Sequence, residues 1–149
     1  MREALPSALD VGGFLVVEIY RYLIAALLQQ DRIDDAKALL AFAARGLPEE
    51  DTYARAALLI AEANVAAATA ESTAAATAFS EALRLLEDQQ LLIDLGEARL
   101  ELARALQKFG DLAGSRTELE RARGIFMTSE ARGMVDEIDR ELEAVKEAG

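Results

Sequence analysis

Apolar residues recur every three or four positions through most of the chain, the spacing that places them on one face of an α-helix. Clear examples run from Tyr20 to Leu27 and from Met134 to Val145. Alanine makes up about a fifth of the residues, while proline and aromatic residues are few. This composition favours closely packed helices over strands. The pattern therefore predicts an all-α protein.

One motif of small and large residues occurs three times along the chain. It consists of a small residue, a large apolar residue four positions later and an alanine three positions after that. The copies begin 39 and 40 residues apart, an interval typical of solenoids built from helical hairpins. The three copies are Ala36-Leu40-Ala43, Ala75-Phe79-Ala82 and Ser115-Leu119-Ala122. We expect each copy to mark the second helix of one hairpin.

Turn and capping residues divide the chain at matching places. Pro48 is followed by acidic residues and suits the first turn of a helix. Gly110 suits a helix end in the left-handed conformation, and Asp111 suits the cap of the next helix. These signals predict one helix that begins near Pro48 and a tight reversal at Gly110.

The motif and the turn signals together define a single domain, residues 1–149, made of three hairpins and a capping helix. The cap carries an apolar stripe between Met134 and Val145, which would cover the open face of the last hairpin. The predicted hairpins cover approximately residues 14–47, 49–88 and 91–127, and the capping helix covers 129–147.

The residue types that are missing exclude several kinds of chemistry. The 149 residues include no cysteine and no histidine. This removes thiolate nucleophiles, zinc–thiolate and iron–sulfur sites, and the commonest general base and metal ligand. Acidic pairs such as Asp34-Asp35 fall at predicted turns and helix starts, where capping and solvation explain them. We therefore expect no enzyme activity, no cofactor and no metal site.

Charge and hydropathy narrow the range of partners. The net charge of −11 repels phosphate backbones and anionic membrane surfaces, so we expect no direct contact with nucleic acid. Residues 11–28 are apolar enough to suggest a membrane span, but Glu18 and Arg21 near the centre disfavour insertion. We interpret this segment as a buried helix, expect no membrane association and predict a cytoplasmic protein.

Residues 20–48 follow the pattern Tyr-x2-Leu-Ile-x2-Leu, a polar turn, and Ala-x3-Leu-x2-Ala-x4-Pro. This pattern resembles the tetratricopeptide repeat (TPR), a helical hairpin repeat. The longer spacing is similar to the long-repeat type found in the arms of ATP-dependent LuxR-type bacterial regulators. The resemblance implies a right-handed superhelical solenoid of about three antiparallel hairpins plus a C-terminal capping helix. It also implies a scaffold for protein–protein interaction in bacterial signalling.

In TPR proteins the first helix of each hairpin lines a concave groove that binds a peptide or a partner protein. The resemblance therefore implies partner-binding positions at Glu18, Arg21, Asn64, Glu97, Arg104 and Lys108. Asn64 matches the place of a ligand-binding amide, and a solvated amide on a helix face is the other interpretation. The three cations suit an acidic segment of a partner, or they are ordinary surface charges paired with nearby glutamates.

The sequence is compatible with three functions. The leading hypothesis is an interaction module that binds a peptide or partner protein, as an adaptor or as the arm of a signalling or transcription regulator. The second is a self-associating structural domain, such as a homodimer, that uses the apolar surface between Phe14 and Tyr22. The third is a regulator arm that senses a small metabolite.

Overall fold

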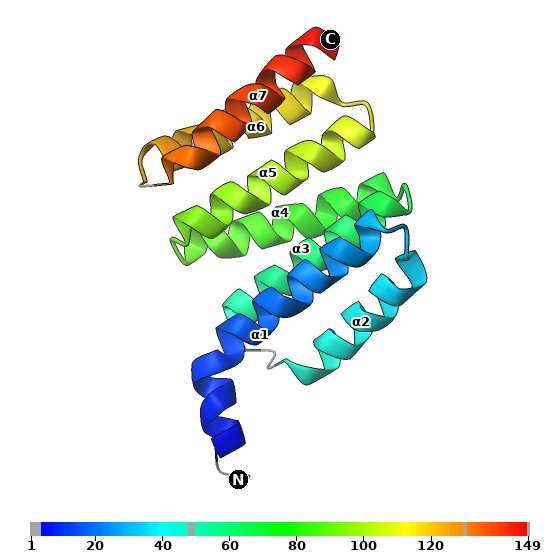
Figure 1. Cartoon of the computed structure of the whole chain (residues 1–149), viewed down its shortest axis with the longest axis vertical. Helices are drawn as coiled ribbons and strands as arrows, with labels where there is room; N and C mark the ends of the chain where they lie inside the picture. Colours follow the sequence, from blue (N-terminus) through cyan, green and yellow to red (C-terminus); the bar gives the residue numbers. More distant parts are fainter. Residues whose placement is uncertain (1–3, 48–49, 130, 149) are drawn as a thin grey trace. The chain divides into compact units, whose positions relative to one another are not determined.

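The computed structural model describes residues 4–47, 50–129 and 131–148 (Figure 1). Seven helices and no strand occur in this described part, which confirms the predicted all-α class. Pro48, where the sequence predicts the start of a helix, lies outside the described residues. The helices are α1 (Ala4–Gln29), α2 (Ile33–Gly46), α3 (Thr52–Ala68), α4 (Ser72–Asp88), α5 (Leu92–Lys108), α6 (Leu112–Met127) and α7 (Arg132–Ala148).

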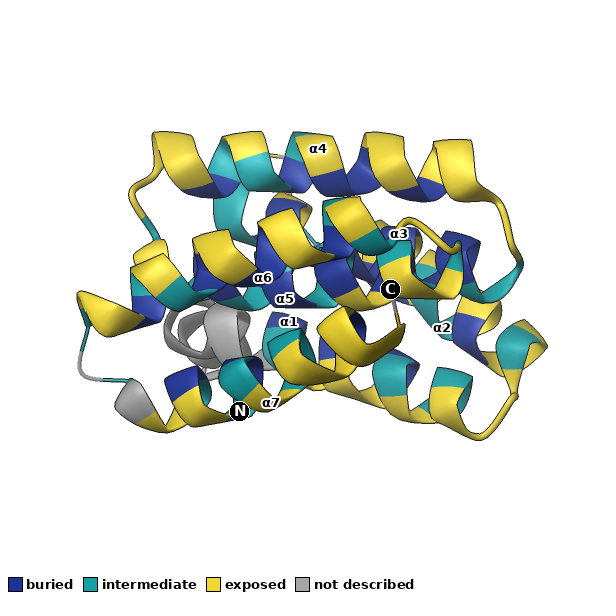
Figure 2. Cartoon of the chain, turned by 90° about the horizontal axis from the view of Figure 1, so that it is seen from above, coloured by how far each residue is buried: buried dark blue, intermediate teal, exposed yellow. Residues whose placement is uncertain are grey.

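The chain divides into two compact units, Met1–Ala82 and Leu83–Gly149. The boundary lies within α4, so this helix begins in the first unit and ends in the second. Figure 2 shows exposed residues along one side of α4 and buried residues along the other, as expected for an amphipathic helix. Phe79 in the first unit and Leu86 in the second are both buried. The two units are described separately below.

In the first unit α1 packs against α2 and α3, and α2 packs against α3. One apolar cluster brings Ile24 of α1 together with Ala36 of α2 and Ala61 of α3. A second cluster joins Val17 of α1 to Ala54 of α3. The buried residues of α3 are mostly alanines, whose short side chains let neighbouring helix backbones approach closely.

The first helix is longer than the sequence pattern suggests. The predicted hairpin starts near residue 14, whereas α1 starts at Ala4. Pro6 lies in its first turn, where the missing N–H has no helical partner to lose. No helix of the described part is long and apolar enough to cross a membrane.

Four connections between successive helices share one backbone geometry. In each, one residue has a positive φ angle, and the N–H of the next residue donates to the carbonyl oxygen five positions earlier at 2.9–3.0 Å. This arrangement satisfies carbonyl groups that a helix end leaves open. The residues with positive φ are Asp31, Ala70, Gln90 and Gly110. The turns at 31, 70 and 110 are 39 and 40 residues apart, which is the interval of the sequence motif.

The capping prediction at the last of these turns is confirmed. Gly110 has a φ angle of 84°, in the left-handed region. The Oδ1 atom of Asp111 accepts a hydrogen bond from the N–H of Gly114 at 2.9 Å, so Asp111 caps α6. Both residues therefore act as the sequence indicates.

The motif that repeats in the sequence marks buried positions in every copy. Ala36, Ala75 and Ser115 are each 1% exposed or less. The alanines that end the motif are equally buried. Ser115 differs from the other two because its hydroxyl is buried without a hydrogen-bond partner among the described residues. Packing therefore requires a small residue at this position, and the structure shows no use for the hydroxyl.

In the second unit α6 packs against both α5 and α7. The apolar stripe predicted on the last helix is confirmed, because Ile138 and Val145 are buried in the core and Met134 and Leu142 pack against it. Leu119 of α6 belongs to the same cluster. The stripe of α7 thus covers the apolar surface of α6 and α5.

A glycine provides room for the largest buried ring of this core. Phe126, at the end of α6, is fully buried. An ideal Cβ built at Gly96 of α5 would lie 2.8 Å from Cζ of that ring, closer than real Cβ atoms come. The absence of a side chain at Gly96 therefore lets the ring lie against α5.

A charged pair also links α5 to α6. The Nη1 atom of Arg99 lies 2.8 Å from Oε2 of Glu118, and both side chains are nearly buried. Arg121 pairs with the other carboxylate oxygen of Glu118 at 3.0 Å. Each oxygen of the buried carboxylate thus accepts from a guanidinium, which offsets its loss of water.

Candidate functional site

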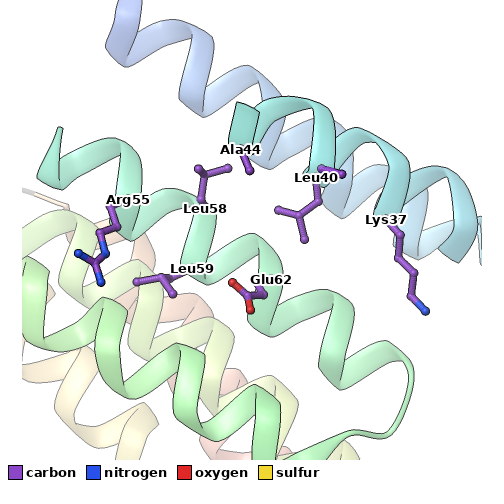
Figure 3. A pocket seen from close by; sticks show the side chains of 8 residues that line it. Lys37, Leu40, Ala44, Arg55, Leu58, Leu59 and Glu62 are labelled. Atoms are coloured by element: carbon purple, nitrogen blue, oxygen red, sulfur yellow. The ribbon is translucent and has the colours of Figure 1, made fainter. Parts of the chain in front are cut away.

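An open groove of about 350 Å³ lies between α2 and α3 of the first unit (Figure 3). Leu40, Leu58 and Leu59 are the largest apolar residues that line it, and Figure 3 shows Lys37 and Arg55 near its two ends. The residues that line it are Lys37, Leu40, Ala41 and Ala44 of α2 and Arg55, Leu58, Leu59 and Glu62 of α3. The groove therefore has an apolar floor and a charged rim.

Helix periodicity explains which residues face the groove. On each helix the lining residues are three or four positions apart, so they share one face. The neighbouring face of α2 carries Ala36 and Ala43, which are buried. Ala41 and Ala44 have side chains too short to fill the space between the helices, and the groove stays open there.

The second unit carries a longer side chain at the matching position of its repeat. Between α6 and α7, the Nε atom of Arg123 lies 2.6 Å from Oδ1 of Asp139. This hydrogen bond is the main reason that the pKa of Arg123 is raised above its ordinary value. Arg123 follows Ser115 by eight residues, as Ala44 follows Ala36. The first unit thus has a methyl group where the second has a side chain that bridges two helices.

Only some of the charges around the groove are paired with other residues that the structure describes. Arg55 pairs with Glu81 of α4 at 3.2 Å. Lys37 and Glu62 are exposed, and neither forms an ion pair with a residue that the structure describes. The rim therefore offers one positive and one negative group to a bound molecule, beside an apolar floor.

Two of the residues predicted to bind a partner form contacts inside the first unit. Arg21 of α1 is 7% exposed, and its Nη1 atom lies 3.7 Å from Oε1 of Glu18. The hydroxyl of Tyr53, on α3, donates a hydrogen bond to the same carboxylate. Asn64 lies further along α3 and is partly buried. Glu18 therefore links α1 to α3 through Tyr53, and Arg21 pairs with Glu18 within α1.

The other predicted residues lie on α5 in the second unit. Arg104 reaches α7, with nitrogen–oxygen distances of 3.2 Å to Glu137 and 3.0 Å to Glu141. The hydrogen bond with Glu141 is the main reason that the pKa of Arg104 is raised. Lys108 is exposed at the end of α5, and Glu97 is partly buried. The predicted role of these residues in a groove shared with α1 and α3 stays a prediction.

The residues that line the α2–α3 groove are absent from the sequence-based prediction. A signal for them exists in the repeat itself, because Ala44 and Arg123 occupy matching positions with side chains of very different length. Leu58 and Leu59 give no comparable signal, since apolar residues in a helix are usually buried. The groove depends on the space left between two helices, and periodicity alone does not report that space.

Comparison with known proteins adds no assignment: no family model, no curated protein and no solved structure matches the chain significantly. Within the described part, no three His, Cys, Asp or Glu residues are grouped so that they could hold a metal ion.

Proposed function

We propose that the protein is a protein–protein interaction module of TPR-like hairpins that holds an apolar side chain of its partner in the α2–α3 groove. It would serve as an adaptor or as the arm of a signalling regulator. The observation that carries the proposal is the open apolar space between α2 and α3, at a position where the chain's second unit places a bridging arginine.

The size and lining of the groove suit an anchor residue better than a large ligand. A volume of about 350 Å³ lies at the low end of small-molecule sites. Covering one leucine or phenylalanine side chain contributes roughly 1.5–3 kcal/mol. One anchor is too little for stable binding, so the partner must also contact the rim at Lys37 and Glu62. An amphipathic helix meets both needs, because it presents apolar and charged residues one turn apart.

The solenoid arrangement itself is part of the proposal. It is supported by the three turns that recur every 39 or 40 residues with one backbone geometry, and by the buried small residues that follow each of them. Such a spacing is typical of helical hairpin repeats. A module of this kind presents its binding surface on helices, which keep the positions of the contacting side chains fixed.

The experiment fills the groove without disturbing the core. Ala44→Arg places in α2 the residue that the matching position of α6 carries, and Ala44 is exposed, so we expect no loss of stability. Ala144→Arg makes the same change at an exposed position of α7 and is the matched control. Asn64→Ala examines the concave groove implied by the TPR resemblance.

The probe is a displayed library of random twelve-residue peptides selected on the wild-type protein. We expect selected peptides to share an apolar anchor, to bind Ala144→Arg like the wild type, and to bind Ala44→Arg at least tenfold more weakly. Equal binding to the wild type and Ala44→Arg would refute the site. Loss of binding in Asn64→Ala alone would assign the peptide to the concave groove instead.

A further inference from the structure

The outer side of α1 is apolar and exposed, on the side opposite its buried residues. Ile19 is 55% exposed, Tyr22 is 61% exposed and Leu23 is 48% exposed, whereas Ile24 is 1% exposed. Residues 19, 22 and 23 lie three and four positions apart, so they form one stripe on the helix. A soluble helix usually carries polar residues on this side. Covering this stripe by another surface would therefore be energetically favourable.

The stripe continues onto α2. Phe42 is 57% exposed, and its ring contacts that of Tyr20 edge to face, with the centroids 6.2 Å apart. Phe42 and Ala44 are two positions apart, which places them about 160° apart around the helix axis. We call Ile19, Tyr22, Leu23 and Phe42 the α1 outer face. It lies on the other side of α2 from the groove described above.

We propose that the α1 outer face binds the same face of a second copy of this chain, forming a twofold symmetric dimer. In a symmetric contact each residue near the axis meets its own copy, so charged residues there would face like charges. Between residues 17 and 29 of α1, the exposed positions are all uncharged, namely Ile19, Tyr22, Leu23, Ala26 and Gln29, although the chain has a net charge of −11. This neutrality suits pairing with an identical surface.

The exposed area of these side chains fits a modest dimer. Fully buried aromatic side chains remove about 150–250 Å² each from water, and aliphatic ones somewhat less. Since each of the four residues is about half exposed, together they present roughly 400 Å². A standard interface covers about 800 Å² on each partner, of which an apolar centre is one part. The four residues thus suffice for the centre of such an interface.

Head-to-tail stacking is less favourable because the described exposed side of α7 is rich in charged residues. Its exposed positions include Asp136, Arg140 and Glu143. Burying these charges against the apolar α1 outer face would leave them without water or partners. The large exposed apolar residues described in the second unit, Leu92, Ile93 and Met127, lie at the ends of α5 and α6. Self-pairing of the α1 outer face therefore covers it in both copies at the lowest cost.

Sedimentation equilibrium over a concentration series from micromolar to hundreds of micromolar tests the proposal. We expect the wild type to approach twice the chain mass of 16.1 kDa. The double variant Ile19→Glu with Tyr22→Glu should weaken dimerisation at least a hundredfold and leave the circular dichroism spectrum unchanged. Met127→Glu alters an exposed apolar residue of the second unit and should still dimerise like the wild type.

A photo-cross-link locates the interface and separates it from the groove. A benzophenone amino acid at position 22, mixed with isotope-labelled wild type, should cross-link to labelled peptides from α1 or α2. Ala44→Arg should dimerise normally, so the dimer and the groove can fail independently. A monomer at every concentration, masses that grow beyond the dimer, or cross-links confined to α7 would each overturn the proposal.

Discussion

Replacing Gly96 by alanine tests the packing of the second unit most directly. The added Cβ would meet Cζ, Cε2 and Cε1 of Phe126 at 2.8, 3.0 and 3.2 Å. The ring is fully buried among Leu119, Ile138 and their neighbours, so it has little room to move. Overpacking of this kind costs about 1–3 kcal/mol. The better helix propensity of alanine offsets up to about 1 kcal/mol, so we expect Gly96→Ala to lower the free energy of unfolding by about 1–2 kcal/mol.

Gly124 provides the matched control. It lies in α6, is exposed, and an ideal Cβ there meets nothing within 4 Å. Gly124→Ala should therefore stabilise the protein by about 0.5–1 kcal/mol through helix propensity alone. Urea denaturation followed by far-ultraviolet circular dichroism measures both variants, and the two should differ by about 2 kcal/mol.

A second substitution separates the clash from other effects of alanine. Phe126→Leu costs stability by itself, because it removes part of a buried ring. In the Gly96→Ala background it should cost less, since the smaller side chain makes room for the new methyl group. A double-mutant cycle should give a coupling energy of about 1 kcal/mol or more. A coupling energy near zero, or a Gly96→Ala variant as stable as Gly124→Ala, would refute the reasoning.

Three further substitutions follow from single features of the structure. Ser115→Ala should raise the free energy of unfolding by about 1 kcal/mol, because a buried hydroxyl without a partner is removed; an unchanged urea midpoint would contradict this. Ala70→Gly should stabilise the turn by up to about 1 kcal/mol, since glycine adopts a positive φ angle without strain, and Ala67→Gly, inside α3, should destabilise by a similar amount. Arg104→Glu should lower the melting temperature more than Arg104→Gln, because it places a carboxylate beside two carboxylates of α7; thermal unfolding of both variants compares them.

The helices and their repeat were predictable because both depend on local sequence. The interval between Ala36, Ala75 and Ser115 matches the interval between the turns that precede them, and all three residues are buried. The roles of Gly110 and Asp111 in the turn were also predictable, since turns and helix caps depend on residues only a few positions apart. Predicting these features requires no information on contacts between residues far apart in the sequence.

The candidate site was harder to predict from the sequence because it depends on contacts between residues that are far apart along the chain. Arg104 meets Glu137 and Glu141, which follow it by more than thirty residues. The contact between Glu18 and Tyr53 depends on how α3 packs against α1, which the sequence of α1 alone does not report. The groove beside Ala44 follows from the length of side chains on two helices at once. Local periodicity carries information on none of these contacts.

The contacts within each unit also bear on how the chain acquires its structure. The helix contacts described above join helices that are adjacent or one apart in sequence, as in α1 with α3 or α5 with α7. Closing the short segments between such helices costs little chain entropy, and proteins with mainly local contacts fold quickly. Contacts of this kind can form as soon as the helices that share them have been synthesised, which shortens the time for which their apolar surfaces are exposed to other chains.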